Sequence, residues 1–494
     1  MKTAVRLITA LAVFATSASA ITTFVHPGAF ESKEEIAFVK AEIKAGTAPR
    51  AAQFEAMRKR FAVPGAAVIP PLDNTNPDSK TNEDQQKEQA QRAYGNALAY
   101  QYTDNKVYAD QAVAILKAWA DVQPYVVYNG KLFQSMLDCA WMGSLLGPAA
   151  ELVRGYMSPA DLTIVTNMFK KVFVPSLSKM DPSNGNRDLT QINAMFSIAV
   201  FTEDAALFEA AKARLAYRMP GYVYLKTDGA KATSIPGADW YVPNFASPNS
   251  NGLMQESCRD WGHHVQFALA TMLSSAEIAW HQGEDLYAVH KDRYIAAMEL
   301  LAKQMNTKEM QGLCTDGKNT TTATVLSTFE IGYNHFHNVM GVPMSNTETV
   351  LTKIRATGES QWNVFYESLT HANIPNTNTG VSSIVGNSST IQTSSSSSKA
   401  NSSSSGNTTA LNGLKSPWNM SVQGETLTLN AVSGTLVNVS ITNLLGNQRK
   451  ALFAGVASGN MNLAWGAGMP HGRYILAVQV GQESRHVLVS ILGH

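Results

Sequence analysis

The sequence predicts a mainly α-helical fold, an (α/α) toroid, followed by a small all-β sandwich. The longer N-terminal part places apolar residues at helical spacing. Short polar turns containing Asp recur in that part at irregular intervals of about 50 to 80 residues. The last 80 or so residues instead alternate apolar and polar side chains, and a serine-rich tract separates the two patterns.

The first 20 residues are expected to be a cleaved secretory signal. "MKTAVRLITALAVFATSASA" has a basic start, an apolar stretch and small residues up to Ala20. No later segment reaches the roughly 18 continuous apolar residues of a membrane span. The sequence therefore predicts an exported protein without a membrane span, extracellular or on the cell surface after transit through the periplasm.

Residues 21–372 are expected to form the toroid. Apolar residues recur every three or four positions in 105–122, 162–177, 192–201, 206–219 and 266–280. "QYTDNKVYADQA", "VFTEDAALFEAA" and "WHQGEDLYAVHK" each place a polar turn with Asp between two helices, and "GYMSPADLTIV" is a fainter copy. Such hairpins indicate stacked antiparallel helix pairs, which either close into a ring around a central cleft or form an open solenoid.

Residues 373–415 are expected to be a flexible linker, because Ser, Asn, Thr and Gly cannot bury enough apolar surface to offset chain entropy. After it, residues 416–494 contain "TLTLNAV", "LVNVSITNLLGN" and "GRYILAVQV", separated by Gly and Asn. This alternation is typical of a small antiparallel sandwich.

The 39 basic and 38 acidic side chains nearly cancel, so the net charge of the protein does not attract nucleic acid or a membrane surface. An anionic partner must therefore be held by a local cluster. Cys139, Cys258 and Cys314 are too few for a disulfide scaffold, and they allow one bridge and one free thiol in any pairing.

Three segments concentrate the unusual polar residues: 183–193, 255–269 and 327–341. Asp260 is read either as the cap of a helix beginning at Trp261 or as part of an active site. Glu256 and Arg259 are read either as a solvated ion pair or as site residues.

The clustered histidines raise the question of a metal. His335 and His337 would share one face of a strand, and with His263 and His264 they suggest a zinc site. No HExxH motif or carboxylate at ligand spacing accompanies them, and adjacent histidines on a helix point apart. The prediction is therefore no metal and no other cofactor.

Arg, His, Asn and Tyr together suit cleavage of a polyuronide by β-elimination. The C5 proton lies α to a carboxylate and is very weakly acidic, so Asn, Arg or His donors must stabilise the developing enediolate. The reaction also needs a base of lowered pKa, a role open to a tyrosine close to Arg and His.

"NGN", "RDWGHH", "AEIAWHQGEDLY", "FEIGYNHFHN" and "ESLTHAN" together resemble the alginate-lyase-like polysaccharide lyases, whose fold is an α/α toroid and whose members include polymannuronate and glucuronan lyases. The resemblance covers roughly residues 24–372. It implies that Asn186 and His263 neutralise the substrate carboxylate, with Arg259 nearby. It implies further that Tyr333 removes the C5 proton and protonates the departing O4.

Seven further residues are expected to contact sugar or support the cleft. They are Gln134, Arg187, Trp240, His264, Asn334, His335 and His337. Two positions depart from the family pattern, because Arg187 follows "NGN" where relatives commonly have Trp, and Trp261 stands in place of Gln in "RDQGH". The identity of the uronate therefore stays open.

The tail, with "VNVSITNLLGNQRKAL" and "MPHGRYILAVQVG", resembles the C-terminal sorting domains of the type IX secretion route. This resemblance implies that the domain binds the secretion machinery. The alternative is that the domain is a carbohydrate-binding sandwich. For the whole protein, two other functions remain: a glycoside hydrolase using Glu256, Asp260 or Glu330 as its acids, and a non-catalytic glycan-binding surface protein.

Overall fold

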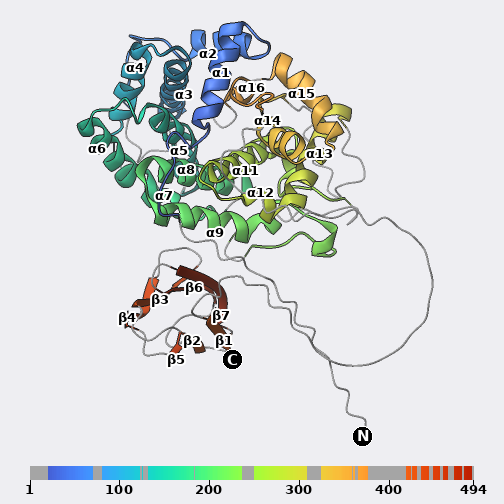
Figure 1. Ribbon diagram of the computed structural model, residues 1–494. Coiled ribbons are helices and arrows are strands. Elements are labelled where there is room, and N and C mark those ends of the chain that lie inside the picture. The colour runs from blue at the N-terminus through green and yellow to red at the C-terminus, as the bar shows by residue number, and fades with distance from the viewer. Residues whose placement is uncertain are drawn as a thin grey trace, which may run out of the picture. The chain divides into compact units, whose positions relative to one another are not determined.

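Two compact units make up the chain, one helical and one β-stranded (Figure 1). The computed structural model describes residues 21–70, 80–122, 125, 132–182, 184–235, 238, 250–308, 324–358, 360–361 and 365–375 in the helical unit. In the other unit it describes residues 419–423, 426–430, 436–443, 449–456, 460–465, 472–480 and 483–491. The expected signal segment and most of the expected linker lie outside these ranges.

Helices account for most of the first unit. Its first half contains α1 (Lys33–Ala45), α2 (Arg50–Arg60), α3 (Lys80–Thr103), α4 (Lys106–Lys117), α5 (Leu132–Val153), α6 (Pro159–Met168), the π-helix η1 (Phe169–Phe173) and α7 (Val174–Leu177). Its second half contains α8 (Gly185–Thr202), α9 (Ala205–Tyr222), the 3-10 helix η2 (Lys226–Asp228), α10 (Ser257–Asp260), α11 (His264–His281), α12 (Leu286–Val289), α13 (Lys291–Thr307), α14 (Glu330–Tyr333), the π-helix η3 (Asn334–Val339), α15 (Ser345–Thr357) and α16 (Glu367–Thr370).

The polar turns noted in the sequence start the second helix of each pair. Side-chain oxygens of Asn105, Asp204 and Asp285 accept the backbone N–H two or three residues later, at 2.9 to 3.3 Å. Each cap satisfies a backbone donor that the helix itself leaves unpaired. Asp104 and Glu203 take left-handed backbone conformations just before two of these caps, with φ of 58° and 52°. The chain therefore reverses direction within a few residues.

The inner helices form a closed ring. Helices α3, α5, α8 and α11 contact one another in this order, α11 contacts α14, and α14 contacts α16. Helix α16 contacts α1, which returns to α3. The ring confirms the predicted toroid and excludes the open solenoid (Figure 1). Within the described ranges, no helix is long and apolar enough to cross a bilayer.

Small residues bring α5 and α8 unusually close. A Cβ atom built on Gly143 would lie 2.9 Å from that of Ala194, and one built on Gly147 would lie 2.4 Å from Oγ of Ser197. Both distances are too short for a real side chain, so only glycine fits at these positions. The contact fixes α8, whose first turn carries the "NGN" motif.

A buried ion cluster ties the first turn of α8 to α9. The carboxylate of Asp188 accepts hydrogen bonds from Arg214, from Arg218 at 2.8 and 3.0 Å, and from the hydroxyl of Tyr222. Asp188 is fully buried, and both guanidinium groups are nearly so. The buried carboxylate of Asp188 keeps its hydrogen bonds only while Arg214, Arg218 and Tyr222 surround it. The cluster therefore orients the start of α8.

The second unit is a sandwich of two antiparallel sheets. One has the order β1-β2-β5, from β1 (Asn419–Gln423), β2 (Thr426–Asn430) and β5 (Asn460–Ala464). The other has the order β4-β3-β6-β7, from β4 (Arg449–Val456), β3 (Leu436–Asn443), β6 (Gly472–Val480) and β7 (Glu483–Ile491). Leu427 and Leu429 of the first sheet share one buried cluster with Val439, Ile441 and Val478 of the second. The alternating pattern read from the sequence therefore packs one face of each sheet into a common core.

Candidate active site

A cavity of about 450 Å³ lies in the helical unit and brings together residues from three of its inner elements. It is lined by Gln134, Leu137, Trp141, Asn184, Asn186, Arg187, Arg259, His263, His264 and Phe267. Helix α5 supplies the first three, the start of α8 the next three, and the α10–α11 region the last four. Six of the expected site residues line this one cavity, which has the size of a small-molecule binding site.

The "NGN" motif lies at the first turn of α8. Asn184 caps the helix, since its side-chain oxygen accepts the backbone N–H of Arg187 at 3.3 Å. The backbone N–H of Gly185 donates to Oε1 of Gln255 at 3.0 Å. These two bonds hold Asn186 and Arg187 at the cavity wall, close to the positive end of the α8 dipole.

Glu256 organises two of the expected catalytic residues. Its carboxylate is 2% exposed and accepts hydrogen bonds from Nδ2 of Asn186 and from Nη2 of Arg259. The sequence suggested a solvated Glu256–Arg259 pair, and the structure corrects this for Glu256, because its carboxylate is buried beneath the amide and the guanidinium. Arg259 itself remains 46% exposed. Glu256 is thus a positioning residue that holds two donors at one point of the cavity.

Arg187 supplies a second guanidinium. Its side chain is 16% exposed, and Nη1 lies 3.8 Å from Oδ2 of Asp181. Burial lowers the pKa of Arg187, while Asp181, Glu256 and Asp138 act in the opposite direction. A guanidinium keeps its charge under such shifts, and its five donors exceed what one carboxylate can accept. Arg187 therefore places a second positive charge at the cavity wall.

The two adjacent histidines lie side by side. Helix α10 ends at Asp260, and α11 begins only at His264, so no helix starts at Trp261 as one reading of Asp260 required. The imidazole centroids of His263 and His264 are 5.1 Å apart. The expectation that they point apart is wrong, because His263 precedes the first turn of α11 and is not part of a continuous helix.

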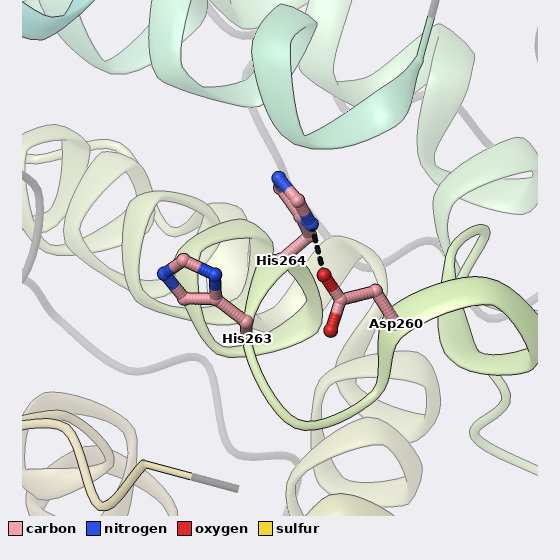
Figure 2. Close-up of side chains that lie close together, drawn as sticks. All are labelled: Asp260, His263 and His264. Carbon is pink, nitrogen blue, oxygen red and sulfur yellow. Dashed lines mark hydrogen bonds and ion pairs between the residues drawn. The ribbon is translucent and has the colours of Figure 1, made fainter. Parts of the chain in front are cut away.

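Asp260 contacts His264 rather than His263. Its Oδ2 is hydrogen-bonded to Nδ1 of His264, as Figure 2 shows. The His263 ring packs on Phe267 at 4.5 Å between centroids. Burial lowers the pKa of His263 and the neighbouring His264 lowers it further, whereas Asp260 and the side chain of Gln361 raise it. Because the net shift lowers the pKa of His263, the neutral imidazole is favoured at pH 7.

Tyr333 is absent from the described lining of this cavity. Its ring stacks on His337 at 4.5 Å, with 9° between the ring planes. Burial raises the pKa of Tyr333, Glu348 and Glu330 raise it too, and Arg355 lowers it less. These contacts do not decide the role of Tyr333 in the reaction, which stays a prediction.

The segment that follows Tyr333 differs from the predicted strand. The segment "NHFHNV" is the π-helix η3 and not a strand, so His335 and His337 do not share a strand face. His335 is 3% exposed and stacks on Tyr287 at 3.7 Å between centroids. Asn334 donates to the carbonyl of His371. None of these three residues lines the cavity as described.

Two expected residues and four unexpected ones complete the picture. Gln134 lines the cavity, and its Nε2 donates to Oδ1 of Asp138 at 2.7 Å. Burial raises the pKa of Asp138 to about 7. Trp240 lies outside the described residues. Sequence reasoning did not name four lining residues, Leu137, Trp141, Asn184 and Phe267. Leu137 and Trp141 follow Gln134 at helical spacing, one and two turns later.

The structure separates two of the cysteines. Cys258, next to Arg259, is disulfide-bonded, and Cys139 is a free, buried thiol. Cys314 lies outside the described residues. A disulfide beside Arg259 restrains the short helix α10. This helix carries Asp260 and Arg259, and Arg259 is the residue that donates to Glu256.

The three acids suggested for a hydrolase are already bound to other side chains. Glu330 is fully buried, and Arg355 binds both of its oxygens at 2.7 and 2.8 Å. Glu256 and Asp260 are each tied to cavity donors. The described residues of the cavity thus lack a free pair of carboxyl groups of the kind that flanks a glycosidic bond in hydrolases.

The chain shares its fold with solved alginate lyases. The apo form of a variant of alginate lyase A1-III matches with 15% identity and a TM-score of 0.52, over 71% of this chain and 98% of that chain. Alginate lyase A1-III from Sphingomonas species A1 matches with 16% identity and a TM-score of 0.46, over 63% of this chain and 88% of that chain. An alginate lyase from Bacteroides ovatus matches with 14% identity and a TM-score of 0.46, over 71% and 100%. No family model and no curated protein matches the sequence. At such identities the likeness is one of fold, the α/α toroid.

Proposed function

We propose that this protein is a polysaccharide lyase that cleaves an anionic polyuronide by β-elimination. The observation that carries the proposal is the cavity in which Asn186, Arg187, Arg259 and a neutral His263 lie together. Two guanidinium groups and an amide suit a carboxylate, because they offer charge-assisted and bidentate hydrogen bonds. The shared fold with alginate lyases supports the same reaction class by analogy.

The carboxylate must be neutralised before the C5 proton can leave. Asn186 and Arg259, both held by Glu256, would bind the acid group of one sugar unit, and Arg187 would bind it from the α8 side. As the C–H bond breaks, negative charge moves onto the carboxylate oxygens as an enediolate. Donors already fixed around these oxygens lower the barrier without having to reorganise.

His263 is the proposed base within this cavity, and Tyr333, to which the family resemblance assigns the step, stays the other candidate. Its neutral imidazole removes the C5 proton, the electrons of the C–H bond form the C4–C5 double bond, and the bond from C4 to O4 breaks. In β-linked mannuronate or glucuronate, the C5 proton and O4 lie on the same ring face. The imidazolium formed on His263 can therefore return the proton to the departing O4, and one side chain serves both steps.

The other cavity residues would hold the sugar chain. Trp141 lines the cavity, and the ammonium of Lys87 lies over one face of its ring, 4.0 Å from the centroid, so a pyranose would stack on the opposite face. Gln134 and His264 add hydrogen-bonding groups to the same wall. Polymannuronate, alginate and glucuronan are the substrates that fit these groups.

The direct test is an assay of the purified protein on polymannuronate, alginate, glucuronan and neutral glucans. We expect products with the ultraviolet absorbance of a 4,5-unsaturated uronate from at least one polyuronide and none from the glucans. Products without that double bond would point to a hydrolase. Tight binding to a polyuronide without any turnover would instead point to a glycan-binding protein.

We also propose that residues 1–20 direct export and that the sandwich, residues 416–494, is a sorting domain for the type IX route. The buried position of Trp465 supports this over carbohydrate binding, because a 2% exposed indole cannot stack on a sugar. Deleting residues 416–494 is expected to leave lyase activity intact and to retain the protein in the periplasm. Cell fractionation measures this, and unchanged surface display would contradict the sorting role.

A further inference from the structure

Three side chains in the α10–α11 turn have the composition of a transition-metal site. One ligand atom each from Asp260, His263 and His264 lies within 4.8 Å of the other two. Figure 2 shows Asp260 facing His264 across the turn, with His263 beside them on the same turn. Two of these residues line the cavity, and all three are partly exposed, so an ion can reach them from solvent.

We propose that Asp260, His263 and His264 bind a divalent transition metal of the Zn²⁺ class. Zinc is commonly held by three protein ligands of this kind, with the fourth position open to water or substrate. At zinc–ligand distances of about 2.1 Å, tetrahedral ligand atoms lie roughly 3.4 Å apart. Asp260 and His264 are in hydrogen-bond contact, so they must separate slightly and give up the shared proton, and the His263 ring must move closer.

The donor set selects among metals. Imidazole nitrogens favour Zn²⁺, Cu²⁺ and Ni²⁺, whereas Ca²⁺ and Mg²⁺ prefer oxygen ligands throughout. The surrounding charges balance, because Arg187 is paired with Asp181 and Arg259 with Glu256. The carboxylate of Asp260 therefore supplies the negative charge that a cation needs.

A second cluster of similar composition is a weaker candidate. Glu35, Glu277 and His281 also group their ligand atoms, but all three are buried. His281 Nε2 already pairs with Glu35 at 3.0 Å and with Glu277 at 3.4 Å. This cluster is an internally satisfied ion network, while the cavity triad is open to solvent on one side.

Metal binding has a consequence for the reaction, and this step alone rests on the proposed function. Zinc would occupy the lone pair of His263 that the elimination requires. We therefore expect added Zn²⁺ to inhibit the lyase reaction and a chelator to restore it. Zinc binding itself is measured without substrate, so its failure and the failure of the lyase proposal can be told apart.

The experiment is isothermal titration of the chelator-treated full chain with ZnCl₂, followed by X-ray absorption at the zinc edge. We expect one Zn²⁺ per chain and a spectrum with nitrogen ligands from imidazole. His264→Ala and the isosteric Asp260→Asn should each weaken binding by more than about 10-fold. His337→Ala, a histidine outside the triad, should leave the affinity unchanged.

Two results would overturn the site. One is the absence of stoichiometric binding to the folded wild-type chain. The other is an affinity that survives in the His263→Ala/His264→Ala double variant, which would assign the zinc to another location. Circular dichroism of each variant establishes that the helical unit is folded, and Asp260→Asn keeps the test available if an alanine variant unfolds.

Discussion

Replacing His263 with alanine is expected to lower kcat/KM on the preferred polyuronide by about 100- to 10,000-fold, the range typical of losing a general base. The side chain offers the neutral lone pair in the cavity that already contains Asn186 and Arg259. Binding should suffer less than turnover, because the amide and the guanidinium still hold the carboxylate. Initial rates of unsaturated-product formation, measured in the presence of a chelator, provide kcat and KM separately.

Tyr333→Phe is the matched control, because it removes the hydroxyl that the family resemblance assigns to the same step. If His263 is the base, its kcat/KM should stay close to the wild-type value, since the Tyr333 ring stacks on His337 and is not among the described lining residues. The opposite pattern, with activity lost in Tyr333→Phe and kept in His263→Ala, would return the base to the tyrosine.

The pH profile gives an independent check on His263. Its pKa is lowered from 6.5, chiefly by burial and then by His264, while Asp260 and Gln361 oppose the shift. A base must be deprotonated, so kcat/KM should fall as the pH drops through this pKa. The acid limb is therefore expected below pH 6.5 in the wild type, and it should be missing from the residual activity of His263→Ala.

The fold was largely predictable because its signals are local. Caps such as Asn105, Asp204 and Asp285 are read directly from the sequence, as is helical periodicity. Closure of the ring was not, because it depends on α1 and α16 meeting across more than 300 residues of chain. No short-range pattern encodes such a contact, so the solenoid remained an alternative until the structure was known.

Six of the ten described lining residues were predictable for a related reason. Asn186, Arg259 and His263 belong to compact motifs with unusual polar residues, whereas Leu137 and Trp141 are ordinary apolar residues on α5. Extending the helical face of Gln134 by one and two turns would have found both. Glu256 was visible in the sequence, but its role depends on Asn186, which is 70 residues distant.

Two of the wrong expectations come from local breaks in the helices. Gly262 stands between Asp260 and His263, and the chain leaves helical geometry there, which places the two imidazoles side by side. Glycine within a helical pattern is a recognised sign of such a break. Around Tyr333, the change from α14 to the π-helix η3 alters which side chains share a face. Alternation over three residues was therefore a poor guide to His335 and His337.

Asp188→Ala is expected to destabilise the helical unit by about 3–5 kcal/mol, the range for removing one partner of a buried ion pair. The change leaves Arg218 and much of Arg214 buried without their carboxylate, and it also removes the acceptor of the Tyr222 hydroxyl. Urea unfolding followed by the helical circular dichroism signal measures the loss. Asp104→Asn is the control, because its ion pair with Lys40 is exposed and should contribute less than about 1 kcal/mol.

The pH dependence of this difference identifies its origin. Burial alone would raise the pKa of Asp188, but Arg214 and Arg218 outweigh it and hold the pKa below its usual range. An acid with a lowered folded-state pKa stabilises the fold above its unfolded value of about 3.9, and this stabilisation is lost as the pH falls through the folded-state value. The gap between wild type and Asp188→Ala should therefore be full at neutral pH and narrow in acid. A gap that stays constant across that range would mean that the alanine acts through lost packing, and that the ion cluster does not fix the first turn of α8 on which Asn186 and Arg187 depend.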